Sequence, residues 1–438
     1  MNPGAMLDLH EGTKIQRIET RRLRFLFDTK SGATPSSGVE EYWDGDINWV
    51  TPEDLGKLEG RYVQDTRRRI TEEGYKNCGV SLAPLDSLVL SKRAPIGQVA
   101  ILSVDATCNQ GCFLLTKQND VDERFYYYAL LYLRPLLEIL GRGSTFTELS
   151  ADDLRSVSLP FPEKKNQCLI ADYLDREIAR IDALVAEKEK MLVLLEEKRA
   201  ALISRAVTRG LDPTAPLKPS GLDWLGDIPA HWEVWKLKYV VEKIGSGITP
   251  RGGAESYQSE GVPLFRSQNI HFDGLRMDDI VYVDAETHES MSNSKVFEGD
   301  VLINITGASI GRCFYIESLQ GEANVNQHVC IVRPAPKIET KFLYFSLRSD
   351  VGQQQIDLSQ SGSGREGLNF ESLGNFSIVI PPLSEQLAII QRLEMADNRS
   401  TELLNEIRNS IERLKERRAA VITAAVTGQI AFEDMKQN

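Results

Sequence analysis

Apolar residues recur at spacings of three and four along two stretches of the chain, Glu163 to Thr208 and Ser384 to Thr427. This spacing predicts two long amphipathic helices, each with a continuous apolar seam. At 1.5 Å per residue each helix would be about 65 Å long, more than one small domain can bury. An antiparallel coiled coil therefore suits the pattern better than two helices that each lie on their own domain. Arg199 and Arg418 interrupt the two seams at equivalent positions, and we expect them to contact the other helix or a partner subunit rather than to extend into solvent.

The second half of the chain repeats the first. PFPEKKNQCLIADYL leads into the first long helix and IPPLSEQLAIIQRL into the second, so that Gln167 and Gln386 are equivalent and 219 residues apart. Near the far ends of the helices, EKRAALISRAVTRG matches ERRAAVITAAVTGQ with the same offset. Outside the helices the offset varies by a few residues. The globular parts are therefore expected to differ in their loops, while the helices keep their length.

The globular parts contain short apolar runs bounded by glycine, proline and aspartate. DSLVLSK and GQVAILSV in the first half, and DVLINIT and CFYIES in the second, predict strands, whereas the segments 125–140 and 340–350 predict helices. We expect an α+β fold in which two globular α/β domains alternate with the two long helices. The expected boundaries are 1–162 for the first domain, 163–210 for the first helix, 211–221 for a proline-rich linker, 222–382 for the second domain and 383–438 for the second helix.

Composition limits how such a chain could meet nucleic acid. Its 438 residues carry 51 Lys and Arg against 63 Asp and Glu, a net charge of −12, so any contact with DNA must come from local basic and polar loops. There is no run of about 18 apolar residues and no signal-peptide pattern, so we expect a cytoplasmic protein without a membrane segment. The six cysteines are then expected to be reduced, and Cys108 with Cys112 lacks a second pair at zinc-like spacing.

The repeated motifs make nearly the whole chain similar to the specificity subunit of type I restriction-modification systems. The resemblance rests on the duplicated plan and on SGATP (31–35) with its copy SGITP (246–250), TGASIG (306–311), IPPLSEQ (380–386), RRAAVITAAVTGQI (417–430) and GLDWLGDIPAHWEVWKLKYV (221–240). The first half departs in one place, because SKRAPIG stands where the second half has ITGASIG.

The resemblance implies two target recognition domains, each of which reads one half of an asymmetric, two-part sequence in double-stranded DNA. It implies that the paired helices set the distance between the halves, about one to one and a half turns of DNA at roughly 34 Å per turn. The implied partners are two modification (methyltransferase) subunits and a restriction subunit, an ATP-dependent translocase and nuclease. S-adenosylmethionine, ATP and magnesium are expected on those partners, and no cofactor or catalytic centre is expected on this chain.

The residues themselves also argue against an enzyme. An amino-methyltransferase needs an Asp/Asn-Pro-Pro-aromatic loop, but Pro381-Pro382 lies between Ile380 and Leu383. The sequence has no GxxxxGK[ST] loop and no HExxH motif, and its five histidines are scattered. A nuclease could use dispersed carboxylates, although such residues are more typical of turns and strand edges: Asp44, Asp46, Asp279 and Asp300. Two alternatives stay open, a self-sufficient DNA-modifying enzyme and a coiled-coil adaptor whose globular heads bind protein.

Candidate DNA contacts are polar and basic residues in the expected loops. Arginine can pair with guanine, and asparagine or glutamine with adenine, each good pair discriminating by roughly 1–3 kcal/mol. The candidates in the first domain are Lys30, Ser31, Thr34, Trp49, Thr51, Lys92, Arg93, Arg142, Ser144 and Thr145. Those in the second domain are Ser246, Thr249, Arg251, Arg266, Gln268, Asn269, Thr306, Ser309, Arg312, Ser363 and Arg365. Any one of them could equally be a solvated loop residue or a turn former, but the set as a whole favours DNA.

Two further groups are left outside this set. The repeated Asn-Gln pairs, at 109–110 and 326–327, suit residues that satisfy buried backbone groups beside strands. The basic run Arg67–Arg69 suits a solvated surface.

Overall fold

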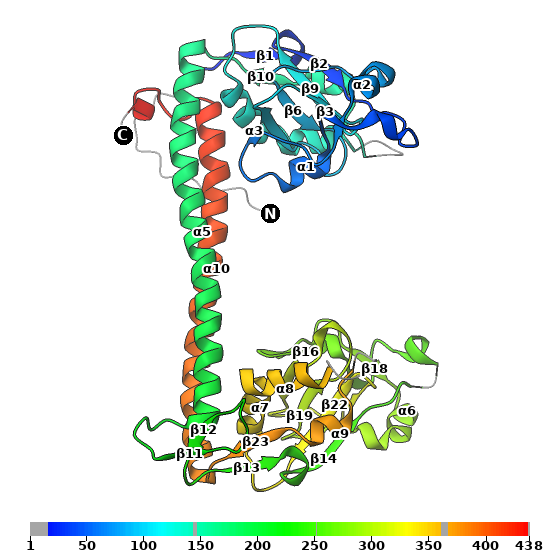
Figure 1. Ribbon diagram of the computed structural model, residues 1–438, viewed down its shortest axis with the longest axis vertical. Helices are drawn as coiled ribbons and strands as arrows, with labels where there is room; N and C mark the ends of the chain where they lie inside the picture. Colours follow the sequence, from blue (N-terminus) through cyan, green and yellow to red (C-terminus); the bar gives the residue numbers. More distant parts are fainter. Residues whose placement is uncertain (1–15, 143–146, 251, 361–366, 437–438) are drawn as a thin grey trace. The chain divides into compact units, whose positions relative to one another are not determined.

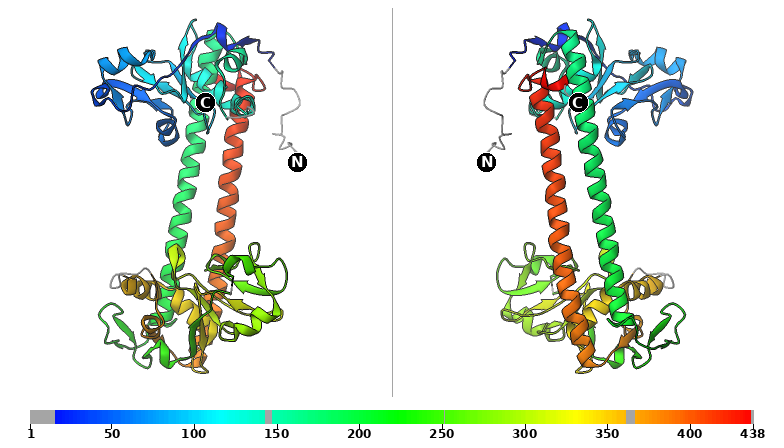
Figure 2. Two further views of the ribbon diagram at one scale, coloured as in Figure 1. Left: turned by 90° about the vertical axis from the view of Figure 1, so that its right-hand side faces the viewer. Right: turned by 90° about the vertical axis from the view of Figure 1, so that its left-hand side faces the viewer.

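The computed structural model describes residues 16–142, 147–250, 252–360 and 367–436. It divides the chain into two compact units, unit 1 (Met1–Lys188 with Asn409–Asn438) and unit 2 (Glu189–Arg408). Two long helices, α5 (Lys164–Arg209) and α10 (Leu383–Val426), contribute to both units, and within each unit they run side by side in opposite directions (Figures 1 and 2). The predicted pair of long helices is therefore confirmed. None of the helices in the described part of the chain combines the length and the apolar character needed to cross a membrane.

Unit 1 contains a five-stranded sheet in the order β2-β9-β6-β7-β4, a three-stranded sheet in the order β5-β3-β8, and the pair β1-β10. Its strands are β1 (Thr20–Arg22), β2 (Phe27–Ser31), β3 (Trp43–Val50), β4 (Tyr62–Val63), β5 (Arg69–Ile70), β6 (Leu88–Ser91), β7 (Val99–Leu102), β8 (Ala106–Cys108), β9 (Cys112–Lys117) and β10 (Ser158–Pro160). Its shorter helices are α1 (Pro52–Lys57), α2 (Glu72–Cys78), α3 (Glu123–Leu140) and α4 (Ala151–Ser156). The strands predicted from DSLVLSK and GQVAILSV are thus β6 and β7.

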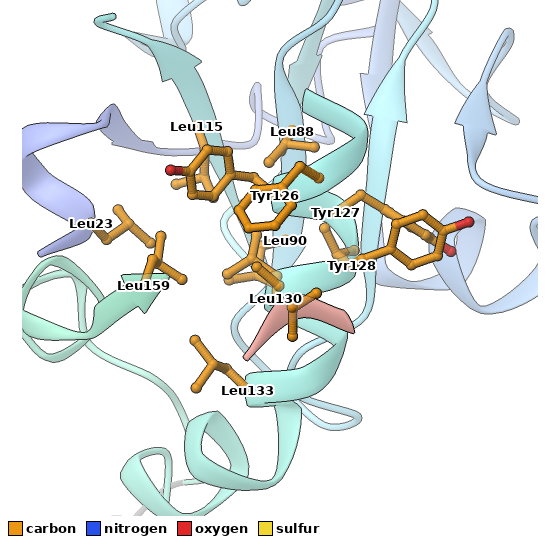
Figure 3. Close-up of a cluster of buried hydrophobic side chains, with 14 of the residues drawn as sticks. Leu23, Leu88, Leu90, Leu115, Tyr126, Tyr127, Tyr128, Leu130, Leu133 and Leu159 are labelled. Carbon is orange, nitrogen blue, oxygen red and sulfur yellow. The ribbon is translucent and has the colours of Figure 1, made fainter. Parts of the chain in front are cut away.

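The core of unit 1 lies between helix α3 and the five-stranded sheet. Tyr126 and Leu130 of α3 face Leu88 and Leu90 of β6, and all four side chains are fully buried (Figure 3). The same cluster takes in apolar side chains from the start of α5 and the end of α10, including Leu174. Burying a leucine of this kind contributes about 1.5–3 kcal/mol, so the helix ends are held to the domain mainly by apolar contact.

Unit 2 contains a four-stranded sheet in the order β14-β22-β19-β20, a three-stranded sheet in the order β18-β15-β21, and the pairs β11-β12, β13-β23 and β16-β17. Its strands are β11 (Leu217–Pro219), β12 (Asp227–Pro229), β13 (Glu233–Lys236), β14 (Val241–Ser246), β15 (Val262–Phe265), β16 (Ile270–His271), β17 (Gly274–Leu275), β18 (Val281–Val283), β19 (Val301–Asn304), β20 (Cys313–Tyr315), β21 (Asn324–Val325), β22 (Val329–Pro334) and β23 (Ser377–Ile380). Its shorter helices are α6 (Ala285–Ser290), α7 (Thr340–Arg348), α8 (Asp350–Gln360) and α9 (Phe370–Gly374). Phe342 of α7 and Val301 of β19 lie in its largest apolar cluster, together with Ile203 of α5 and Leu393 of α10.

The helix predicted over 340–350 ends earlier than expected. Helix α7 stops at Arg348, and Ser349 separates it from α8. The Ser349 hydroxyl accepts a hydrogen bond from the backbone N–H of Gly352 at 3.1 Å, as an N-terminal cap does. A serine at this position therefore closes one helix and starts the next.

Candidate nucleic-acid interface

In each unit, four loops that carry the repeated motifs lie next to one another. In unit 1 they are the SGATP loop (31–35), the SKRAPIG loop (91–97), the Asn-Gln turn (109–111) and the segment that ends at Leu149. Gly32 N–H donates to Cys112 O at 3.1 Å, Lys92 N–H donates to Gly111 O at 2.8 Å, and Leu149 N–H donates to Lys92 O at 2.9 Å. Backbone hydrogen bonds thus join each loop to the next. We call these four loops the loop cluster of unit 1.

Unit 2 builds the same cluster from the SGITP loop (246–250), the NITGASIG loop (304–311), the Asn-Gln turn (326–328) and the segment that reaches Leu368. Gly247 N–H donates to Asn326 O at 3.2 Å, Ile305 N–H donates to His328 O at 3.0 Å, and Leu368 N–H donates to Ile305 O at 2.8 Å. The three hydrogen bonds that define the cluster therefore join the corresponding loops in the same order in both units. Motifs that are scattered in the sequence become neighbours at one place in each domain.

The glycine of each SG(A/I)TP motif stands against the backbone of the Asn-Gln turn. A Cβ atom on Gly32 would lie 2.1 Å from Asn109 O, and one on Gly247 would lie 1.6 Å from Val325 O. Neither separation is possible for real atoms, so any other residue would push two loops of the cluster apart. The small side chain is required here by close approach of two backbone segments.

Substituting Gly32 by alanine is expected to destabilise unit 1 by about 1–3 kcal/mol, the usual cost of forcing an extra methyl group into packed surroundings. Gly38 is the matched control, because it follows the same loop and a Cβ atom there would meet nothing within 4 Å. Chemical unfolding of the two variants measures the difference. Equal loss of stability for Gly32→Ala and Gly38→Ala would show that the loops do not meet as described.

The repeated asparagines hold the turns of the cluster. Asn109 Oδ1 accepts a hydrogen bond from Gly111 N–H at 2.8 Å, and Asn326 Oδ1 accepts one from His328 N–H at 3.1 Å. The interpretation of these residues as partners for backbone groups is confirmed. The neighbouring glutamine of unit 1 has a different task, because Gln110 Oε1 accepts a hydrogen bond from the Thr34 hydroxyl and so joins two loops.

In each unit a further loop follows an equivalent strand, β3 in unit 1 and β15 in unit 2. Strand β3 pairs in parallel with β8, and β15 pairs in parallel with β21, in the two three-stranded sheets. In the loop after β3, Asp54 accepts a hydrogen bond from Thr51 N–H at 2.8 Å; after β15, Asn269 accepts one from Arg266 N–H at 2.9 Å. These contacts align Thr51 with Arg266 and Asp54 with Asn269, an equivalence that the sequences WVTPEDL and LFRSQNI do not reveal.

Three candidate residues in these loops have their polar groups bound within the domain, and two of them, Trp49 and Asn269, are buried. Trp49 is 4% exposed and its indole N–H donates to Ala33 O at 2.9 Å. Asn269 is fully buried and its amide donates to Arg276 O at 2.8 Å. Thr51 is the N-cap of α1, and its hydroxyl donates to Asp54 at 2.6 Å. The polar groups of these three side chains are thus engaged by partners within their own domain.

The other described candidates lie at or near the surface. Lys30, Ser31, Thr34, Arg93, Arg142, Thr249 and Gln268 are exposed, and Lys92, Ser246, Arg266, Thr306, Ser309 and Arg312 are partly exposed. Five candidates, Ser144, Thr145, Arg251, Ser363 and Arg365, lie outside the described residues.

Several basic candidates are already paired with a carboxylate. Lys92 and Arg93 both contact Glu148, each at 3.0 Å. Burial would raise the pKa of the Glu148 carboxyl, but the hydrogen bonds from Lys92 and Arg93 hold this pKa below its ordinary value. One carboxylate thus faces two cations, which leaves a local excess of positive charge beside the SKRAPIG loop.

In unit 2 the corresponding polar groups are neutral or bound to backbone. The Thr306 hydroxyl lies 2.6 Å from His328 Nδ1, and Ser309 Oγ accepts a hydrogen bond from the Asn304 amide at 3.1 Å. Arg266 donates to Asp279 O at 2.6 Å, and Gln268 donates to the Asp279 carboxylate at 3.1 Å. Asp279 is therefore a positioning residue for the loop after β15 rather than a nuclease carboxylate in a cluster.

The three arginines of the basic run Arg67–Arg69 make two different kinds of contact. Arg67 pairs with Glu53 at 2.8 Å and Arg69 pairs with Asp65 at 2.8 Å. Such ion pairs are typical of a solvated surface. The Arg68 guanidinium instead lies 3.6 Å from the ring centre of Trp43, whose indole N–H donates to Ser36 O beside the SGATP loop. Arg68 therefore packs on Trp43 beside the SGATP loop, a contact that the sequence did not indicate.

The two arginines in the helical seams make contacts between the helices. Arg199 of α5 donates two hydrogen bonds to Asp397 of α10, at 2.5 and 2.7 Å, within unit 2. Arg418 of α10 contacts Asp182 of α5 at 2.9 Å within unit 1. Of the two roles expected for these arginines, the structure shows the contact with the other helix.

One group among the described residues has the geometry to hold a metal ion, formed by His288, Glu289 and Glu322. The amino group of Lys295 already lies 2.8 Å from Glu289 and 3.6 Å from Glu322. A fixed positive charge therefore stands at these carboxylates, which makes the group a structural ion network. The six cysteines, all within the described residues, are free thiols, and burial raises the pKa of Cys108, Cys313 and Cys330 to about 12, so these three are poor nucleophiles.

The sequence is similar to that of known proteins over most of its length. The profile of the family described as "Type I restriction modification DNA specificity domain" matches residues 16–192 and again 229–413. The type I restriction enzyme MjaIX specificity subunit of Methanocaldococcus jannaschii is 26% identical over 421 residues, covering 95% of this chain and 94% of the relative. The type I restriction enzyme EcoBI specificity subunit of Escherichia coli is 25% identical over 337 residues, covering 75% and 70%.

Solved structures show the same fold. A chain from a study of complex assembly and conformational transition of the type I R-M system superposes with a TM-score of 0.72 at 15% identity, covering 94% of this chain and 98% of that one. The HsdS subunit from Thermoanaerobacter tengcongensis gives a TM-score of 0.52 at 17% identity, covering 96% and 100%.

Proposed function

The chain belongs to the type I restriction-modification DNA specificity family, and from this premise we propose that its two loop clusters read the two halves of an asymmetric DNA target. It is the specificity subunit of such a system and has two DNA recognition domains. The proposal extends to the residues that contact the DNA and to the half of the target that each domain reads.

The observation that carries the proposal is one backbone scaffold built twice with different side chains. The same hydrogen bonds join the loops in both units, so Lys92 and Arg93 of unit 1 correspond to Ile305 and Thr306 of unit 2. Phosphate contacts position a protein on DNA, whereas side chains at base edges specify the sequence. Two equal scaffolds with unequal polar groups are therefore suited to a target whose halves differ.

The loop after β3 and β15 shows the same contrast. Counting from the aligned capping residues, Glu53 of unit 1 stands where unit 2 has Gln268. Glutamate can only accept hydrogen bonds, for example from cytosine, whereas glutamine can pair with adenine through both of its polar atoms. Together with the exposed candidates of the loop clusters, these two positions form the proposed reading surface. Trp49, Thr51 and Asn269 are left out of it.

The subunit is proposed to act by binding and scaffolding. The helix pair α5 and α10 would set the separation of the two half-sites, at about one to one and a half turns of DNA. Modification subunits, two in number, would dock on the protein and carry S-adenosylmethionine, and a restriction subunit would carry ATP and magnesium. The target base must be taken out of the helix stack into a pocket of the modification subunit, because that chemistry cannot reach a stacked base. No cofactor is assigned to this chain and no residue of it is given a catalytic role.

The proposal is tested by expressing the chain with its modification subunit and mapping methyladenine across the host DNA. We expect a two-part asymmetric motif that is absent when the modification subunit is expressed alone. Replacing residues 222–382 by the corresponding segment of a specificity subunit with a known target should change one half of the motif only. The matched control replaces residues 1–162 and should change the other half.

Methylation at an unchanged motif after either replacement would contradict the assignment of one half-site to each domain. A stable complex without any methylation would favour the coiled-coil adaptor. Methylation by the isolated chain would favour the self-sufficient enzyme.

A further inference from the structure

A cavity of about 760 Å³ opens in unit 2 between the two long helices and the turn that connects β16 to β17. Each helix offers one face to it, with lining residues at spacings of three and four: α5 from Glu196 to Ile203 and α10 from Thr401 to Arg408. The β16–β17 turn forms the opposite wall. Its position is fixed because the Tyr344 hydroxyl of α7 donates a hydrogen bond to Phe272 O in the turn.

Positive charge exceeds negative charge around this cavity. Arg199 and Arg348 both bind a single carboxylate, Asp397, which has an exposed fraction of only 21%. Three more arginines reach the cavity, namely Arg276, Arg312 and Arg408. The carboxylates beside these five arginines are Glu196, Asp273 and Asp397. Five positive and three negative charges leave an excess of two positive charges, in a chain whose net charge is −12.

Arg312 has no partner of its own among the residues that the structure describes. Its guanidinium is partly buried, and none of the side-chain hydrogen bonds or ion pairs of the described residues involves it. A charged group taken partly out of water without a partner is unfavourable, and an anionic ligand would remove this cost. Arg312 also directly follows the NITGASIG loop, since its backbone O accepts from Asn304 N–H at 2.8 Å. Arg312 therefore lines the cavity directly beside the end of the NITGASIG loop.

We infer that this cavity binds a phosphate group, and that the backbone of the DNA beside the half-site read by unit 2 supplies it. The guanidinium groups have the planar, forked donors that suit phosphate oxygens. The inference rests on the proposed function as far as DNA is the source. A free phosphate compound would meet the same chemistry, and the experiment separates the two sources. Contact with DNA would then come from a spacer helix, through Arg408, as well as from the recognition loops.

Unit 1 supplies a contrast. There Arg418, which corresponds to Arg199 at the offset of 219 residues, pairs with Asp182 at 2.9 Å, and the residue equivalent to Arg408 is the carboxylate Glu189. No equivalent excess of charge is left at this place among the described residues of unit 1. The phosphate contact is thus expected at one half of the target only.

The test measures DNA binding by the complex of this chain with its modification subunit, using fluorescence anisotropy on a duplex that carries the mapped target. Arg312→Gln and Arg408→Gln should each weaken binding about eightfold at 0.1 M salt and reduce the slope of log K against log salt by about 0.9, the value for one phosphate contact. The loss should be equal on target and non-target duplexes, and the methylated motif should not change. Arg413→Gln is the control, since Arg413 is exposed and lies about 140° around α10 from Arg408.

A second arm starts from the wild-type complex and changes the DNA instead of the protein. Neutral methylphosphonate groups are placed one at a time along the duplex, and the wild-type complex should lose affinity at one or two positions beside the half-site of unit 2. Those positions should have no effect on the Arg312→Gln complex. Inorganic phosphate and ATP are tested in parallel for a rise in the melting temperature of the wild-type complex.

The outcomes separate the two claims. A melting shift with inorganic phosphate or ATP that Arg312→Gln abolishes, without any effect on DNA binding, assigns the cavity to a free phosphate compound. Unchanged DNA binding in both variants, no sensitive methylphosphonate position and no melting shift would overturn the inference. If the wild-type complex bound target and non-target duplexes equally well, that result would count against the proposed function. It would not count against the phosphate contact, because this contact is expected to be equal on target and non-target duplexes.

Discussion

Replacing Gln386 by leucine is expected to lower the free energy of unfolding of unit 2 by about 3 kcal/mol or more. Gln386 is fully buried near the start of α10 and satisfies three backbone groups. Its Oε1 accepts a hydrogen bond from Glu339 N–H at 2.8 Å, and its Nε2 donates to Pro381 O at 2.9 Å and Lys337 O at 3.1 Å. Each buried group left without a partner costs about 1–3 kcal/mol, and leucine has a similar size but supplies none of these bonds.

The control lies five residues further along the same helix. Gln391 is exposed, so Gln391→Leu should change stability by no more than about 0.5 kcal/mol. Gln167 is the equivalent residue of unit 1 and satisfies two groups, Asp122 N–H at 2.9 Å and Pro162 O at 2.8 Å, so Gln167→Leu should have a smaller effect than Gln386→Leu.

Hydrogen exchange locates the effect as well as measuring it. In Gln386→Leu, the amide of Glu339 and the first turn of α7 should exchange faster, while the amides of unit 1 should keep their protection. Equal stability of the Gln386→Leu and Gln391→Leu variants would show that the buried amide is not what joins α10 to α7. The repeat of a glutamine at this spacing then would need another explanation.

These glutamines show what the sequence could reveal and what it could not. Their spacing of 219 residues exposed the duplication, and the apolar periodicity around them predicted the two long helices. Both signals are local or repetitive, so they can be read without knowing the fold. The role of the side chain was not readable, because its partners come from segments tens of residues away.

The candidate DNA contacts show the same limit more sharply. Asn269 and Gln268 are neighbours in FRSQN, and both residue types can pair with adenine. In the structure Asn269 is buried as a turn partner while Gln268 is exposed. Asparagine and aspartate satisfy nearby backbone groups as readily as they contact a ligand, so sequence alone cannot assign one of these roles. Motif position identified loops that lie next to one another in the structure, but only the fold shows which of their side chains are exposed.

The contacts of Arg199 and Arg418 could be predicted only in part. Their equivalence suggested a common role, and each does bind an aspartate of the other helix. Their surroundings differ, however. Asp397 binds two arginines, whereas Asp182 pairs with Arg418 and is half exposed. The sequence offset therefore predicts the contact and not its strength, which depends on burial.

Replacing Asp397 by asparagine is expected to lower the free energy of unfolding of unit 2 by about 3 kcal/mol at neutral pH. The carboxylate binds two arginines with exposed fractions of only 10% and 8%, Arg199 and Arg348. Its removal would leave the Arg348 guanidinium without this counter-charge and Arg199 with the more distant Glu196, at 3.7 Å. Loss of one member of a buried ion pair costs about 3–5 kcal/mol, and the partial exposure of Asp397 favours the lower end. Asp182→Asn is the matched control, because the exposed pair that it forms with Arg418 should contribute less than about 1 kcal/mol.

The pH dependence of this difference provides an independent readout. Burial would raise the pKa of the Asp397 carboxyl, but the hydrogen bond from Arg199 and the charge of Arg348 lower it below the ordinary value. A carboxyl whose pKa is lowered by folding stabilises the protein above its unfolded pKa of about 3.9, and this contribution is lost as the pH falls through the lower folded pKa. Urea unfolding of the wild type and of Asp397→Asn should therefore differ by a constant amount from pH 7 down to about pH 4 and converge below it. A difference that stays constant to pH 3, or one no larger than that of Asp182→Asn, would show that the charge of Asp397 does not hold the two arginines, and the excess of positive charge at the cavity would then have to be neutralised elsewhere.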